Sequence, residues 1–209
     1  MKIGILGTGD VGQALGKGFA DLGHDVKMGS RDPNNAKMKA WVAKTGKNAS
    51  GGTFAEAAEF AEVAVIATLW SGTESALKLA NPRNLAGKVV IDATNPLVFA
   101  PGGPPTLALG HTDSGGEQVQ RWLPNAKVVK AFNIIGNTLM VNPQLPGGPP
   151  DMFIGGNDAG AKQKVTEICT AFGFQTTDLG GIDAARLLEP MCIGFVTGGW
   201  SHAFKMLRK

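Results

Sequence analysis

The sequence contains no tyrosine and only three histidines and two cysteines among its 209 residues. Because tyrosine is absent, no reaction of this chain can use a phenolic proton donor. The histidines and cysteines stand apart, without a CxxC or HExxH spacing, so we expect no metal centre. Two cysteines in apolar segments do not form a disulfide framework, which is typical of a reducing compartment such as the cytoplasm.

Charge and long apolar runs are also scarce. Charged residues make up 18% of the chain and the net charge is +3, which does not predict nucleic-acid binding. The longest apolar stretch, Val63 to Trp70, is far shorter than the roughly 20 residues that span a bilayer. The first residues hold too few apolar side chains for a secretory signal core. We therefore expect a soluble, cytoplasmic protein, away from membranes, whose partner is a small molecule.

Glycine is abundant, with 30 residues of 209, about twice its average share of roughly 7%. One cluster, Gly7-Thr8-Gly9-Asp10-Val11-Gly12, follows the apolar run Ile3 to Leu6 and precedes a helical pattern. A second strand, Asp25 to Met28, comes at the expected period of about 30 residues. This order of strand, glycine turn, helix and strand predicts dinucleotide binding. Gly7 permits the tight turn, Gly9 admits the pyrophosphate, and Gly12 lets the helix lie close to the strand.

The residues after the second strand indicate which dinucleotide binds. Ser30 and Arg31 stand where an NAD enzyme places a carboxylate on the ribose 2′-hydroxyl. A hydroxyl and a guanidinium instead favour a 2′-phosphate, so we predict NADP, with Asn35 as a further phosphate contact. Asp32 is the counter-argument, because it would serve NAD if it turned inward. Asp before Pro33 more often begins a turn.

Strand and helix patterns alternate along the rest of the chain. Strands are predicted over 63–69, 88–93, 127–132, 152–154 and 174–177, and helices over 36–44, 53–62, 73–79, 114–123 and 159–172. Serine or threonine with glutamate three residues later, at 53–56 and 114–117, predicts two capping boxes. The alternation predicts an α/β fold, a Rossmann-type doubly wound and mostly parallel sheet. We assign residues 1–181 to this NADP-binding domain and 182–209 to a short, mostly helical C-terminal extension, with a helix over 193–207, packed on the domain or on a dimer partner.

Several strand ends carry candidate ligand contacts, because open α/β sheets bind ligands at the carboxyl ends of their strands. Asn95 either binds the nicotinamide half of the cofactor or begins an Asx-turn. Trp70 either flanks the cofactor or fills core space. The repeated letters PGGPP at 101–105 and 146–150 are either stiff loops at these strand ends or ordinary surface connections. The candidates at the strand ends are Thr68, Leu69, Trp70, Asn95, Pro96, Ala131 and Asn133.

No acid–base device stands out in the sequence. His111 lies between a glycine and a threonine in a predicted loop, where a solvated role is expected, and Lys130 alternates into a strand as a structural residue. We therefore name no catalytic residue. Without a proton donor, the reaction that suits this chain best is direct hydride transfer between two bound cofactors.

Five segments together resemble the deazaflavin (coenzyme F420)-dependent NADP oxidoreductases, namely residues 2–9, 29–31, 92–97, 128–133 and 187–190. The same pattern occurs in the cytosolic reductase domain of the six-transmembrane ferric reductases. The resemblance implies a homodimeric NADP enzyme whose second ligand, a deazaflavin or flavin, lies against the nicotinamide. It implies a second site shaped by both PGGPP loops and by a tail that carries Met191, Cys192 and Trp200. It also assigns the pyrophosphate to Thr8, Gly9, Asp10 and Val11, the 2′-phosphate to Ser30 and Arg31, and the border of the nicotinamide to Asn95 and Ala131.

The sequence thus predicts an NADP(H)-dependent oxidoreductase that passes hydride to or from a deazaflavin or flavin. One alternative is an NADPH-dependent imine or keto-acid reductase, which usually needs a proton source and a longer helical C-terminal domain. Another is an NADP-binding sensor or partner subunit without turnover. The second substrate, the physiological direction and the oligomeric state stay open at this point.

Overall fold

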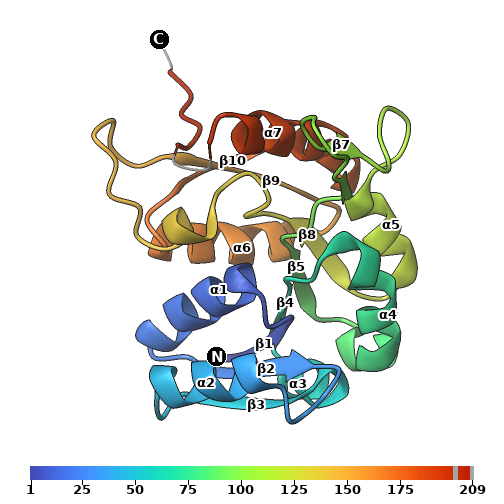
Figure 1. The fold of residues 1–209 in the computed structure, drawn as a ribbon, viewed down its shortest axis with the longest axis vertical. Helices are drawn as coiled ribbons and strands as arrows, with labels where there is room; N and C mark the ends of the chain where they lie inside the picture. Colours follow the sequence, from blue (N-terminus) through green and yellow to red (C-terminus); the bar gives the residue numbers. More distant parts are fainter. Residues whose placement is uncertain (200–201, 208–209) are drawn as a thin grey trace.

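The computed structural model describes residues 1–199 and 202–207 (Figure 1). The strands are β1 Lys2–Leu6, β2 Asp25–Ser30, β3 Ala49–Thr53, β4 Val63–Ile66, β5 Val89–Asp92, β6 Leu97–Val98, β7 Thr106–Leu107, β8 Lys127–Lys130, β9 Asp151–Gly156 and β10 Gln175–Asp178. The α-helices are α1 Asp10–Asp21, α2 Ala36–Thr45, α3 Phe54–Phe60, α4 Trp70–Ala80, α5 Gly115–Trp122, α6 Ala159–Ala171 and α7 Ala185–Thr197. Short 3-10 helices are η1 Pro82–Leu85, η2 Asn137–Leu139 and η3 Ile182–Ala184.

One sheet of eight strands runs through the molecule in the order β10-β9-β8-β5-β4-β1-β2-β3. The six strands from β3 to β8 in this order are parallel, as in a dinucleotide-binding Rossmann sheet. Strand β9 is antiparallel to β8 and parallel to β10. The predicted doubly wound, mostly parallel sheet is confirmed.

Helices cover both faces of this sheet. Helices α1, α2 and α6 contribute to one buried core, and α3, α4 and α5 contribute to the other. Figure 1 shows α1 and α6 on one side of the central strands and α4 and α5 on the opposite side. Strand β4 supplies Val63 and Val65 to the first core and Ala64 and Ile66 to the second, which explains why its sequence is apolar throughout.

Of the two predicted capping boxes, one forms completely. The Thr53 hydroxyl accepts from the Glu56 N–H at 3.2 Å, and the Glu56 carboxylate accepts from the Thr53 N–H at 2.6 Å. At α5 the Ser114 hydroxyl accepts from the Glu117 N–H at 3.2 Å, but Glu117 binds the Ser114 hydroxyl and Arg186 instead of the backbone. The second box is therefore only half formed, because an arginine from α7 takes its carboxylate.

Two predictions about strands and one about the tail need correction. Strand β3 was missed because its sequence, ASGGT, has no apolar run, and the β6–β7 hairpin was missed because each strand has two residues. Its turn is the first PGGPP loop, 101–105. The helix expected over 193–207 ends at Thr197, where Gly198 and Gly199 follow and Gly199 has a φ of +98°.

The tail packs on the body of the molecule. Leu188 of α7 forms a small buried cluster with Ile134 and Phe153. Beyond α7, the Phe204 carbonyl accepts from the Asp151 N–H at 2.9 Å, so the tail returns along the start of β9. Trp200, which was expected to shape the second site, lies outside the described residues. Within the described part, no helix is both long and apolar enough to cross a bilayer.

Candidate functional site

The glycines of the turn between β1 and α1 differ in whether the fold requires them. Gly7 has a φ of +134°, and a Cβ there would lie 2.3 Å from the Ala67 carbonyl oxygen. A Cβ at Gly12 would lie 2.5 Å from the Gly7 carbonyl oxygen. A Cβ at Gly9 would meet no atom within 4 Å. The protein itself therefore requires glycine at 7 and 12, whereas no neighbouring atom requires glycine at 9.

Helix α1 begins directly after this turn. Gly9 is its N-cap, and no side chain caps the first N–H groups. These groups, with the positive end of the helix dipole, suit an anion. The Gln13 side chain donates to the Thr8 carbonyl at 2.9 Å and fixes the turn, while Asp10 is exposed and Val11 packs on the core. The residues predicted to bind pyrophosphate thus surround one helix N-terminus.

The end of β2 presents a hydroxyl and a cation. Ser30 is buried, and its hydroxyl accepts from the Asp32 N–H at 3.3 Å. Arg31 is exposed, and no hydrogen bond or ion pair joins its side chain to another described residue. Asp32 accepts from the Asn34 N–H at 2.8 Å, so its side chain forms a turn instead of pointing inward. The Asn35 side chain caps α2 through the Met38 N–H at 3.0 Å, so part of its binding capacity is used by the fold.

The residues after β4 take three different positions. The Thr68 hydroxyl lies 2.9 Å from the Thr73 hydroxyl. Leu69 is 83% exposed just before α4, so it offers an apolar surface at this strand end. The Trp70 ring stacks on Trp122 of α5 with 5.5 Å between ring centroids. Of the two interpretations of Trp70, packing between helices is the one that these contacts support, and its contact with a cofactor stays a prediction.

Two asparagines join the ends of β5 and β8. The Asn95 amide donates to the Asn133 carbonyl at 2.8 Å, and the Asn133 amide donates to the Asn95 side-chain oxygen at 2.9 Å. Asn95 therefore uses its side chain across strands and not in an Asx-turn. Its neighbour Pro96 is buried, and so is Ala131, whose N–H donates to the Asp92 carbonyl at 3.2 Å.

A buried group of charges lies beneath these strand ends. Lys130 Nζ is 3.0 Å from Asp92 Oδ2, 2.8 Å from Glu189 Oε1 and 2.5 Å from the Thr94 carbonyl. All three charged side chains are at most 1% exposed. Burial alone would lower the pKa of Lys130, but Asp92 and Glu189 outweigh it and the pKa is raised. Lys130 thus stays protonated and acts as a structural cation.

Glu189 also ties α7 to α5. Its carboxylate accepts from the N–H groups of Gly115 and Gly116, each at 2.9 Å, at the start of α5. Asp92 and Glu189 were not predicted from the sequence as members of this cluster. The available signal was a charged residue inside an otherwise apolar segment, such as Leu187 to Cys192, because such a charge needs a buried partner.

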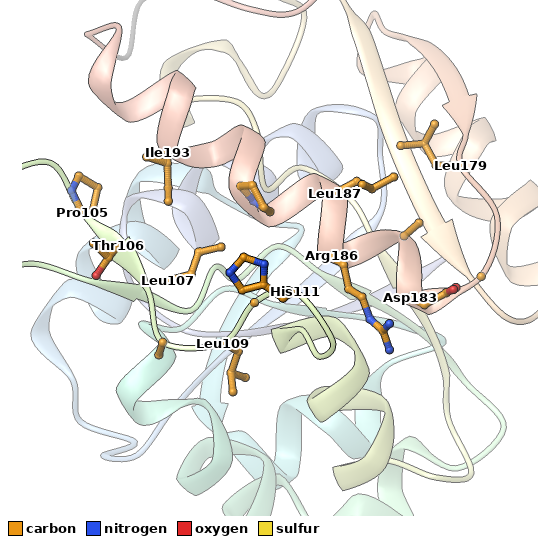
Figure 2. A pocket seen from close by; sticks show the side chains of 15 residues that line it. Pro105, Thr106, Leu107, Leu109, His111, Leu179, Asp183, Arg186, Leu187 and Ile193 are labelled. Atoms are coloured by element: carbon orange, nitrogen blue, oxygen red, sulfur yellow. The ribbon is translucent and has the colours of Figure 1, made fainter.

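A groove of about 920 Å³ lies elsewhere, between the β6–β7 hairpin region and the outer face of α7. Figure 2 shows Arg186, Leu187 and Ile193 of α7 on one side and Leu107 and His111 on the other. None of the residues predicted to bind the cofactor lines this groove. It is separated from the charge cluster by α7, because Leu188 and Glu189 face the interior while Leu187 faces the groove.

The fold and the glycine turn define a dinucleotide-binding protein of the Rossmann class. Residues 2–96 match the family described as NADP oxidoreductase, coenzyme F420-dependent. The chain is 32% identical to the F420-dependent NADP reductase of Methanothermobacter marburgensis, over 90% of this chain and 88% of that protein. The protein belongs to the family of coenzyme F420-dependent NADP oxidoreductases.

Other similar proteins fit this assignment. A crystal structure from Arthrobacter sp. FB24, provisionally described as an F420-dependent NADP reductase, is 40% identical over 100% of both chains with a TM-score of 0.93. The chain is also 32% identical to Metalloreductase STEAP3 of Rattus norvegicus, covering 90% of this chain and 36% of that protein. This chain therefore spans about a third of that relative. Imine reductase structures, at 15% to 18% identity, share the fold alone.

Proposed function

We propose that this protein is an NADP(H)-dependent oxidoreductase that transfers hydride between the nicotinamide and the deazaflavin of coenzyme F420. The proposal is carried by the relationship to F420-dependent NADP reductases along nearly the whole chain. The unpaired Arg31 beside Ser30 supports NADP over NAD, because a guanidinium complements a 2′-phosphate. The open space at Gly9, beside uncapped helix N–H groups, fits a pyrophosphate.

The strand order gives the dinucleotide a direction. Strand β2 lies on one side of β1, whereas β4, β5 and β8 lie on the other. A 2′-phosphate at the end of β2 and a pyrophosphate at α1 direct the nicotinamide half toward β4, β5 and β8. We assign the pyrophosphate to Gly7, Thr8, Gly9, Asp10, Val11 and Gly12, the 2′-phosphate to Ser30, Arg31 and Asn35, and the nicotinamide half to Thr68, Leu69, Trp70, Asn95, Pro96, Ala131 and Asn133.

The bound nicotinamide supplies or accepts the hydride. The chain then contributes binding, orientation and exclusion of water. None of the residues assigned to the nicotinamide half has a titratable side chain, and the charged cluster around Lys130 beneath them is buried and paired. We also propose that residues 1–181 form the NADP-binding domain and 182–209 a C-terminal extension, and that the protein is a cytoplasmic homodimer. The homodimer is supported by the apolar rim of the groove, where Leu187 is 62% exposed.

A turnover assay tests the proposed function. The purified protein is mixed with NADPH or NADH and with coenzyme F420, FMN, FAD, a cyclic imine or a keto acid, and nicotinamide absorbance is followed. We expect NADPH oxidation with coenzyme F420 and far slower oxidation of NADH. Turnover of the imine or keto acid alone would favour a reductase of that class. NADPH binding without turnover of any acceptor would favour a sensor.

A further inference from the structure

The buried side chain of Asn133, at the candidate site, has a hydrogen-bond acceptor without a partner. Asn133 is 3% exposed, and its amide nitrogen donates to Asn95 Oδ1 and to the Leu188 carbonyl, each at 2.9 Å. Both amide hydrogens are therefore engaged, and turning the amide over would lose both bonds. Asn133 Oδ1 has no hydrogen-bond partner among the described residues. A buried acceptor left unpaired is unfavourable, so a ligand that supplied a donor to this oxygen would be stabilised by it.

The backbone just before Asn133 is strained as well. Phe132 has a φ of +61°, which is unusual for a bulky residue. Its N–H leaves the sheet pattern and donates to the Met152 sulfur at 3.2 Å. Strained residues of this kind persist where the surrounding structure fixes them, and they cluster at ligand sites. The strain turns the chain at the end of β8, where Asn133 pairs with Asn95.

A ring of hydrogen bonds and ion pairs holds Asn133 in place. The Leu188 carbonyl that Asn133 binds is next to Glu189, whose carboxylate pairs with Lys130 at 2.8 Å. Lys130 also binds the Thr94 carbonyl, and Thr94 precedes Asn95. The ends of β5 and β8 and the helix α7 are thus linked around one amide. The free oxygen of Asn133 is rigidly placed, as a group that orients a ligand needs to be.

Asn133 follows strand β8, on the side of β1 toward which the nicotinamide half is directed. Strand β8 is three strands from β1, on the side away from β2. With about 4.8 Å between neighbouring strands, its end is roughly 14 Å from the glycine turn. The phosphates are assigned to β1 and β2, so the far end of the cofactor, which carries a carboxamide, extends to this position. That carboxamide has N–H donors and Asn133 has a free acceptor.

We propose that Asn133 Oδ1 accepts a hydrogen bond from the carboxamide N–H of the nicotinamide and so fixes which way the ring lies. This inference rests on the proposed function for the identity of the cofactor. Asn133 is then a positioning residue. It sets the ring orientation without taking part in the transfer of hydride itself.

The test compares binding of NADP⁺ with binding of its 3-acetylpyridine analogue, in which a methyl group replaces the carboxamide nitrogen. Dissociation constants are measured by calorimetry for the wild type, Asn133→Ala and Asn84→Ala. Asn84 is the matched control because its amide also donates to a backbone carbonyl, at 3.0 Å, but far from this site. Binding is measured without any acceptor, so a failure of F420 turnover does not affect the result.

We expect the wild type and Asn84→Ala to bind NADP⁺ about five- to hundredfold more tightly than the analogue. In Asn133→Ala the two affinities should lie within about twofold of each other. A purely structural role for Asn133 would weaken both ligands equally and leave the ratio unchanged, which overturns the inference. Equal affinities in the wild type also overturn it, and that measurement needs no variant.

Discussion

At the scale of single residues, packing requires glycine at some positions of the glycine turn and not at others. Gly7 and Gly12 are enclosed by backbone oxygens, so the fold alone demands glycine there. Gly9 and Arg31 are not constrained by any described neighbour, and their side-chain space faces solvent. Substitutions at the two kinds of position should therefore separate stability from cofactor binding.

Gly9→Ala and Gly12→Ala form one such matched pair. We expect Gly9→Ala to keep a near wild-type melting temperature but to bind NADPH about tenfold or more weakly, because a methyl group would disturb the charge-assisted bonds to phosphate. Gly12→Ala should lose about 1–3 kcal/mol of stability, since its Cβ would meet the Gly7 oxygen at 2.5 Å. Thermal unfolding and NADPH titration measure both. A large drop in melting temperature for Gly9→Ala would contradict the open space described here.

Arg31→Gln tests the preference for the phosphorylated cofactor. Removing one charged hydrogen-bonding group costs about 1.5–3 kcal/mol, so the dissociation constant of NADPH should rise about tenfold to 150-fold. The affinity for NADH should stay unchanged, because NADH has no 2′-phosphate. Arg83→Gln, an exposed arginine in η1, is the control for loss of a positive charge. An equal loss for both cofactors would show that Arg31 acts elsewhere.

At the scale of elements, α7 depends on a buried cation that belongs to a strand. Glu189 of α7 reaches Lys130 of β8 and the first N–H groups of α5. Such a cluster contributes little when it is intact, because desolvation offsets the attraction. It becomes very unfavourable when one partner is removed, so these elements should come apart together.

Lys130→Met should therefore destabilise the protein by about 3–5 kcal/mol at pH 7, since it leaves two buried carboxylates without their cation. The second substitution in Lys130→Met/Glu189→Gln should recover part of this loss. In the wild type the pKa of Lys130 is raised, so its contribution is complete below the unfolded lysine value of about 10.4. That contribution is lost as pH rises through the folded pKa. Urea unfolding from pH 7 to 11 measures both effects, and a Lys130→Met protein as stable as wild type would refute them.

Sequence patterns predicted the elements whose causes are local. The glycine turn, the Thr53 capping box and the apolar strand β4 each carry their reason within a few residues. Strand β3 forms only because β2 pairs with it, and its own sequence gives no signal. The site was predicted residue by residue, but the pairing of Asn95 with Asn133 joins positions 38 apart. The link from Lys130 to Glu189 was missed for the same reason.

At the scale of the whole molecule, the groove along α7 is a large surface with an apolar rim that the described residues leave uncovered. Its rim includes Leu187, 62% exposed, and Leu179, 37% exposed. Exposed apolar surface of this kind marks protein contacts. A second copy of the chain that packs α7 against the same helix of its partner would cover it.

The proposed dimer predicts that Leu187→Asp is a monomer, because the substitution would place a charge in the proposed apolar contact. Sedimentation velocity of the wild type and the variant measures the change. Leu79→Asp is the control, since Leu79 is also exposed, at 48%, but lies on α4 outside the groove. A wild type that sediments as a monomer at all concentrations would rule out the dimer.

The two outermost strands limit how copies can meet. Strand β3 reads ASGGT and β10 reads QTTD, so neither border offers the hydrophobic ribbon that recruits a foreign strand. Growth of the sheet from molecule to molecule is therefore disfavoured, and this composition also guards the protein against fibrous aggregation. Association between copies is therefore expected through helices, because a contact between two helix faces can close after one partner and does not extend into a fibre.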